Sequence, residues 1–281
     1  MGYHIEPGVM YMMPTHFGPL SGPRQGPDLK PFNHVASPKS TTYTVSFLTD
    51  ADQLEALCPP GFAVAGEPVV TIASVHLTEV EWLAGRGYNV LGVMFPVTYS
   101  GERDRAAGPL LAVLWENLAD PILTGREQIG FAKIYAEIPA PIIRGNETHL
   151  SASWLGFRFV DIAIRNLIAV PPANYPPPPE VARDGIALGM LHYKYIPGTG
   201  QDSTPDADYA VLQPNGYSQA RTTALWRGEG SVQFHAASWE DMPTQYHIVN
   251  ALASLQIKQA RGASLSTSIG GEDFSRQRRL R

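Results

Sequence analysis

The sequence of 281 residues contains a single cysteine, Cys58. One cysteine cannot form an intramolecular disulfide, and this favours a reducing, cytoplasmic compartment. The first residues lack the positively charged stretch and the apolar run of a secretory signal. No apolar run approaches the roughly 18 residues that span a bilayer, so we expect no membrane partner.

Positive charge is scarce and scattered, with a formal net charge of −5. Nucleic acids and anionic membrane surfaces require clustered lysine and arginine, so we expect no nucleic-acid partner. The eight histidines show no spacing typical of metal ligands, and the sequence has neither a Gly-x-Ser-x-Gly elbow nor a phosphate loop. We therefore expect no metal and no cofactor, although scattered histidines could still assemble a metal site in space.

Glycine and proline divide the chain into three parts. Residues 1–38 predict an irregular, Gly/Pro-rich N-terminal arm, whose apolar residues suggest packing on the body or on a neighbouring subunit. Residues 39–265 predict one domain, because they contain no internal repeat and no clear linker. Residues 266–281 predict a polar, basic tail.

Short segments rich in β-branched and aromatic residues, separated by turn residues, indicate consecutive antiparallel strands. A short helix is expected from Asp50 to Cys58, and a long one from Pro243 to Ala260. The fold class is therefore α+β and mainly antiparallel β, as a closed or cone-like barrel or a double-layered sheet with few peripheral helices. The expected strands are 42–48, 68–78, 89–99, 109–117, 149–160, 186–196, 208–213, 217–227 and 230–237.

One of the five lysines, Lys133, has apolar and aromatic neighbours on both sides. In an extended segment, Phe131, Lys133 and Tyr135 share one face, because strand side chains alternate. Apolar surroundings disfavour the charged form and lower the pKa of a lysine from about 10.4 towards neutrality. A neutral amine can attack a carbonyl and form an iminium. The alternative is a structural lysine that extends its head to solvent at a sheet edge.

The segment Gly125-Arg126-Glu127, with Lys133 shortly after it, resembles the active-site signature of the acetoacetate decarboxylase family. Weaker similarities follow in the same order over roughly residues 40–265. The resemblance implies that Lys133 is the Schiff-base lysine, that the fold is a cone-like antiparallel barrel, and that the chain forms homo-oligomers. The expected catalytic residues are Lys133, Glu127 and Arg126, and the expected substrate-binding residues are Phe131, Gln128, Tyr88 and Trp115. Glu116 and Tyr99 are further acid–base candidates.

The sequence also departs from the family pattern. Ile134 replaces a second lysine that follows the first in the family, and Val90 takes the place of the catalytic glutamate. The arginine that would hold a substrate carboxylate falls near Ser40, although Arg24 could substitute if the arm folds inward. Efficient decarboxylation of acetoacetate is therefore not expected.

We thus expect a cofactor-independent lyase that acts on a small oxo acid or related carbonyl compound through a lysine Schiff base. Decarboxylase chemistry and aldolase–dehydratase chemistry both fit, because an iminium stabilises the carbanion that each produces. The second is slightly favoured. The alternative is a non-catalytic β-barrel that binds a small hydrophobic ligand, which the loss of the second lysine and the glutamate would allow.

Overall fold

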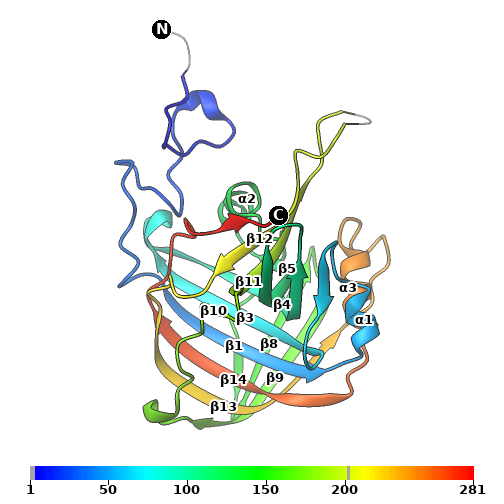
Figure 1. Cartoon of the computed structure of the whole chain (residues 1–281). Coiled ribbons are helices and arrows are strands. Elements are labelled where there is room, and N and C mark those ends of the chain that lie inside the picture. The colour runs from blue at the N-terminus through cyan, green and yellow to red at the C-terminus, as the bar shows by residue number, and fades with distance from the viewer. Residues whose placement is uncertain (1–3, 201–202) are drawn as a thin grey trace.

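One large sheet forms the body of the computed structural model, which describes residues 4–200 and 203–281 (Figure 1). Its strands are β1 (Lys39–Leu48), β2 (Phe62–Val64), β3 (Val69–Val80), β4 (Arg86–Ser100), β5 (Arg105–Glu116), β6 (Lys133–Tyr135), β7 (Ile142–Arg144), β8 (Glu147–Trp154), β9 (Phe157–Ala169), β10 (Ala182–Arg183), β11 (Ile186–Ile196), β12 (Ala207–Pro214), β13 (Arg221–Phe234), β14 (Gln259–Ile269) and β15 (Arg278–Arg279).

The helices are few and short. They are α1 (Ala51–Glu55), α2 (Ala119–Thr124) and α3 (Tyr246–Ala253), with single turns η1 (Thr15–Phe17), η2 (Glu81–Leu83) and η4 (Pro172–Asn174) and the π-helical turn η3 (Gly125–Ile129). Across residues 4–200 and 203–281, no helix is long and apolar enough to cross a membrane.

The strands follow the order β15-β12-β11-β5-β4-β3-β1-β14-β13-β9-β8-β7, with β2, β6 and β10 attached to β4, β5 and β11. Neighbours are antiparallel except for the pairs β11–β5 and β5–β6. The sheet curves strongly (Figure 1), but its end strands β15 and β7 do not pair with each other. The expected fold class is confirmed, while the closed form of the barrel is not adopted.

Four predicted elements, one helix and three strands, differ from the structure. The long helix from residue 243 to 260 is reduced to α3, and β14 occupies residues that were assigned to the helix end and the tail. The two strands predicted at 217–227 and 230–237 form one continuous strand, β13, and the strand predicted at 149–160 is a hairpin of β8 and β9. The α3 helix ends early because the backbone N–H of Lys258 donates to the carbonyl of Leu48 and begins sheet pairing.

The main core lies against one face of the sheet. Trp115 of β5 is fully buried and packs on Phe159 of β9, with ring centroids 5.0 Å apart. Its indole N–H donates to Gln245, just before α3, so that β5 and α3 are joined inside the core. Burial of such large aromatic side chains is a main source of stability in the fold.

The N-terminal arm contacts the body where the chain approaches β1. The guanidinium of Arg24 donates to the carbonyl of Phe274, in the segment that follows β14. The side-chain amide of Gln128, in η3, donates to the sulfur of Met12. These contacts hold the arm beside α2 and the C-terminal segment.

Candidate active site

Strand register brings Tyr88, Glu116 and Lys133 to the same face of the sheet. Leu114 of β5 pairs with Lys133 of β6, and Glu116 pairs with Val90 of β4. Directly paired residues point to the same side, and residues two apart on a strand do so as well. Tyr88 therefore shares this face with Glu116 and Lys133, whereas Trp115 points to the opposite face.

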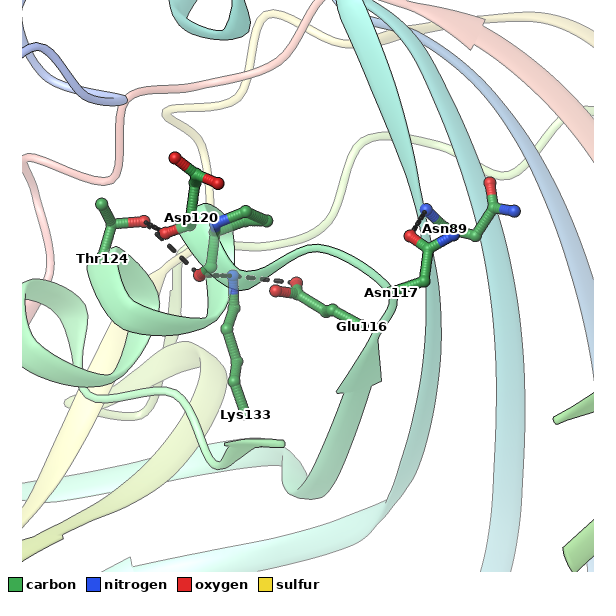
Figure 2. Close-up of polar contacts among 7 residues, drawn as sticks. Asn89, Glu116, Asn117, Asp120, Thr124 and Lys133 are labelled. Atoms are coloured by element: carbon green, nitrogen blue, oxygen red, sulfur yellow. Dashed lines mark hydrogen bonds and ion pairs between the residues drawn. The ribbon is translucent and has the colours of Figure 1, made fainter. Parts of the chain in front are cut away.

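Lys133 is buried, with 5% of its surface exposed, although it carries an amine. Its side chain extends from β6 and ends between the carboxylate of Glu116 and the first turn of α2 (Figure 2). The Nζ atom lies 2.9 Å from Oε1 of Glu116 and donates to the carbonyl of Pro121 at 3.0 Å. The predicted apolar burial of this lysine is confirmed, but its head meets a buried acid and does not extend to solvent.

The turn between α2 and β6 leaves room for the lysine. A Cβ on Gly125 would lie 2.7 Å from Nζ of Lys133, which is closer than real carbon atoms approach. Gly130 ends the π-helical turn with φ of 78°, a left-handed conformation that glycine adopts without strain. The Arg126 guanidinium then donates to the backbone carbonyl of Lys133 at 2.8 Å. The two glycines and Arg126 together fix where the amine lies.

Burial, and not the acid beside it, lowers the cost of a neutral amine at Lys133. Burial lowers the pKa of Lys133, and the charge of Glu116 partly opposes this effect. Burial likewise raises the pKa of the Glu116 carboxyl, with Lys133 as the opposing influence. Two groups whose pKa values move towards each other can exchange a proton at little cost. The second oxygen of Glu116 is buried and has no hydrogen-bond partner among the described residues.

Aromatic and imidazole rings enclose the amine on other sides. The Phe131 ring centroid lies 5.2 Å from Nζ of Lys133, within the range of a cation–π contact. His192 of β11 meets the same ring edge-on at 4.2 Å and is fully buried. Burial, together with the charge of Lys133, lowers the pKa of His192 to about 3, so its imidazole stays neutral. Neither ring nitrogen has a hydrogen-bond partner in the described chain, although Gln213 lies close by.

Tyr88 completes this face as an un-ionised phenol. Burial raises its pKa well above the ordinary value, and the charge of Glu116 adds to the effect. A phenol in this state can donate a hydrogen bond but does not act as a base near neutral pH.

The other expected site residues have different surroundings. Arg126 is exposed except for the bond to the Lys133 backbone, and the backbone carbonyl of Glu127 accepts a bond from Lys194. Gln128 is half-buried and contacts the arm. Trp115 lies in the core on the other face of the sheet. The structure thus gathers Lys133, Phe131 and Tyr88, and Arg126 holds the backbone of Lys133. The contacts of Glu127, Gln128 and Trp115 are with Lys194, the arm and the core instead of the amine.

The departures from the family pattern have structural counterparts. Ile134 pairs with Trp115 and packs against the main core, so the position after the lysine faces away from the amine. Val90 is buried and pairs with Glu116, so an acid is retained one strand away from the position where the family has its glutamate. Arg24 folds inward and is half-buried, with its Nε atom lacking a partner among the residues described.

Two residues of the site, Glu116 and His192, carry little signal in the sequence. Glu116 was one of several acid–base candidates, and its position at the end of a predicted apolar strand was the available signal. His192 is one of eight scattered histidines in the sequence, and its proximity to Phe131 depends on the parallel pairing of β11 with β5. Such a contact between distant strands leaves no local pattern in the sequence.

Known proteins share this architecture. The family model of acetoacetate decarboxylase matches residues 12–262. A solved acetoacetate decarboxylase superposes with a TM-score of 0.63 at 17% identity, covering 86% of this chain and 88% of that one. The acetoacetate decarboxylase from Legionella pneumophila subsp. pneumophila str. Philadelphia 1 superposes with a TM-score of 0.58 at 19% identity, covering 88% of this chain and 91% of that one. The enduracididine biosynthesis enzyme MppR in complex with pyruvate superposes with a TM-score of 0.53 at 16% identity, covering 83% of this chain and 86% of that one. No match is found among the curated proteins.

Proposed function

The chain belongs to the acetoacetate decarboxylase family, and from that premise we propose that it is a lyase acting on a small carbonyl compound through a Schiff base at Lys133. The observation that carries the proposal is the buried amine of Lys133, 2.9 Å from the equally buried carboxylate of Glu116. Such a pair supplies a nucleophile and a proton carrier in one place.

In the first step Glu116 takes a proton from the ammonium of Lys133, which leaves a neutral amine. The nitrogen lone pair attacks the substrate carbonyl carbon, and the carbonyl electrons move to oxygen to give a carbinolamine. Glu116 then returns a proton to the hydroxyl, water leaves, and a cationic iminium remains on Lys133. The carboxyl group of Glu116 thus takes the role of the catalytic glutamate that Val90 replaces here, while burial lowers the pKa of Lys133 in place of the second lysine that Ile134 replaces.

The iminium then accepts electrons from a breaking bond. The bond between the α and β carbons of the substrate then breaks, and its electron pair moves through the iminium to the nitrogen to leave an enamine. A β-carboxylate leaves as carbon dioxide, whereas a β-hydroxyl carbon leaves as an aldehyde after the hydroxyl has given its proton to the Glu116 carboxylate. Protonation of the enamine carbon and attack of water on the iminium release the product and restore the amine. In the reverse direction the enamine adds to an aldehyde. The ring of Phe131 lies where it favours the cationic states of the nitrogen.

Aldolase–dehydratase chemistry on a pyruvate-type oxo acid is the form we favour, with decarboxylation second. The enzyme MppR, which shares the fold, has been solved with pyruvate and with a condensation product of pyruvate and imidazole 4-carboxaldehyde. Val90 and Ser40 here also replace the glutamate and the arginine on which acetoacetate decarboxylation relies in the family. The un-ionised phenol of Tyr88 can stabilise a developing alkoxide on this face.

Borohydride trapping tests the proposal directly. The full chain is incubated with pyruvate or acetoacetate, reduced, and weighed by intact mass spectrometry. A substrate-sized mass increase that Lys133→Met abolishes supports the Schiff base, whereas the exposed Lys39→Met variant should still form the adduct. If no oxo acid in a panel gives an adduct, the chain is instead a binding protein for a small ligand.

A second measurement separates the two reactions. Release of carbon dioxide from acetoacetate is compared with release of benzaldehyde from benzylidenepyruvate, each with wild type and Lys133→Met. Aldehyde release that depends on Lys133 supports the aldolase–dehydratase assignment. Carbon dioxide release without aldehyde release would assign the chain to the decarboxylases.

A further inference from the structure

A cavity of about 290 Å³ lies on the same face of the sheet as Lys133. Its floor is a row of directly paired residues that runs from Ser268 of β14 through Ser40 and Leu77 to Tyr88 of β4. Val75 and Trp82 add apolar walls, and the segment after β14 closes one side with Glu272 and Phe274. The volume is at the lower end of the range for small-molecule pockets, about 300–1,000 Å³.

Three lining residues of the cavity adjoin the candidate active site. Tyr88 lies close enough to Glu116 for that carboxylate to raise its pKa. The Phe274 ring meets the Phe131 ring edge-on at 5.4 Å, and Phe131 in turn covers the amine. Gln213 lies beside His192. The cavity therefore ends next to Lys133 and extends away from it.

The charged residues that line the cavity are acidic. Glu81 and Glu272 contribute carboxyl groups, while no lysine or arginine of the described chain lines it. The guanidinium of Arg24, which follows the lining residue Pro23, donates to the Phe274 carbonyl and interacts with the charge of Asp273. Glu272 is held by a hydrogen bond from the side-chain amide of Gln213. The Nε2 atom of His34, on the same wall, is buried without a partner among the residues described.

We propose that this cavity binds the part of the carbonyl substrate remote from Lys133, and that it takes an apolar body of about one ring ending in a neutral or cationic hydrogen-bond donor. A carboxylate at that end is rejected because it would face Glu272 without a compensating cation. The identity of the bound molecule as a substrate rests on the proposed function. The preference for a donor over an anion is a property of the cavity alone.

The preference is measured with two ligands of nearly equal shape that cannot form a Schiff base, 4-(hydroxymethyl)benzamide and 4-(hydroxymethyl)benzoate. Calorimetric titration is carried out on the full chain and on Lys133→Met. We expect the amide to bind at least about tenfold more tightly than the benzoate, a difference of about 1.4 kcal/mol. The same preference is expected in Lys133→Met, because the cavity does not require the amine.

The variant Glu272→Gln should reduce the preference for the amide to within about threefold. Benzoate binding becomes stronger because the ligand carboxylate no longer faces the carboxylate of Glu272. The matched control is Glu240→Gln, which removes an exposed acid elsewhere and should leave the preference unchanged. Leu77→Trp, which fills the floor, should abolish binding of both ligands while circular dichroism shows an intact fold. Absence of amide binding to wild type, or an unchanged preference in Glu272→Gln, would overturn the proposal.

The connection to Lys133 is tested with the corresponding aldehydes, 4-formylbenzamide and 4-formylbenzoate. Borohydride trapping should give the amide adduct at Lys133 faster than the benzoate adduct, and Glu272→Gln should remove the difference. If the alcohols show the preference but no aldehyde is trapped, the cavity assignment stands and the Schiff-base function fails. If aldehydes are trapped at equal rates and the alcohols bind equally, the Schiff-base function stands and the cavity assignment fails.

Discussion

At the scale of single residues, Glu116 is the charged neighbour that opposes the effect of burial on the protonation of Lys133. The two side chains are 7% and 1% exposed, and the 2.9 Å contact between them is sheltered from water and salt. Glu116→Gln should slow adduct formation with pyruvate about 10²-fold, because the carbinolamine loses the acid that protonates its hydroxyl. Initial rates of borohydride-trapped adduct measure the effect. A variant as fast as wild type would show that another group moves the proton.

The pH dependence of the same reaction follows from burial. Since burial lowers the pKa of Lys133, the rate of adduct formation should rise with pH through a midpoint below 10.5. The charge of Glu116 raises the pKa of the lysine, so Glu116→Gln should shift that midpoint to lower pH while reducing the plateau rate. A rate profile from pH 5 to 11 for both proteins provides the test. A wild-type midpoint near 10.5 would mean that the lysine is not desolvated in solution.

Gly125 is the residue whose absent side chain makes room for the amine. Gly125→Ala would place a methyl group 2.7 Å from Nζ, so Lys133 must move away from Glu116. Such overpacking typically costs about 1–3 kcal/mol, and adduct formation should fall together with the free energy of unfolding. Urea titration and borohydride trapping measure the two effects. Gly22→Ala is the control, because its added carbon meets its nearest neighbour at an ordinary 3.6 Å.

At the scale of elements, Gln245 lies directly before α3 and links this helix to β5 and β6. It accepts from the Trp115 indole of β5 at 2.8 Å and donates to the Tyr135 carbonyl of β6 at 3.0 Å. Gln245→Leu would leave the indole N–H buried and unpaired, so the free energy of unfolding should fall by about 1–3 kcal/mol. Urea denaturation measures it, with exposed Gln233→Leu as the control. An equal loss of unfolding free energy in Gln245→Leu and Gln233→Leu would show that the bond between Gln245 and the Trp115 indole does not stabilise the fold.

The elements that the sequence predicts well are those whose residues favour one structure locally. β1, β3, β4 and β11 are rich in β-branched and aromatic residues and lie close to their predicted ranges. β14 is different: its alternating serine and small residues have little strand preference, and it is stabilised by β1 and β13 on either side. The hydroxyl pair Ser40–Ser268 at 2.6 Å is one such contact across strands.

The same distinction applies to the candidate site. Lys133 could be predicted because its apolar neighbours and the Gly125-Arg126-Glu127 segment are local in sequence. Glu116 and His192 reach it through β5–β6 and β11–β5 pairing, which no local pattern specifies. Nearness along the chain is not sufficient either, because Gln128, close to the lysine in sequence, contacts the arm, whereas Tyr88, expected from the family resemblance, lies on the site face.

At the scale of the whole molecule, the later part of the N-terminal arm and the segment after β14 meet beside the candidate site. The arm supplies Arg24, whose guanidinium holds the Phe274 carbonyl at 2.9 Å, and Phe274 packs on Phe131 (Figure 1 shows both segments at one end of the sheet). The wall between the cavity and Lys133 thus depends on residues about 250 positions apart, and it should loosen when this contact is removed.

Arg24→Met should free the C-terminal segment without unfolding the sheet, because the lost bond lies outside the strand pairs. Charge-assisted hydrogen bonds contribute about 1.5–3 kcal/mol, so amide hydrogen exchange in residues 271–277 should accelerate about 10- to 150-fold. Adduct formation at Lys133 should change as well, since Phe274 no longer supports Phe131. Arg221→Met is the matched control: it removes a guanidinium–carbonyl bond to Val35 of the arm, at 3.0 Å, away from Phe274. Faster exchange of residues 271–277 in both variants would mean that the arm as a whole, and not Arg24, holds the segment in place.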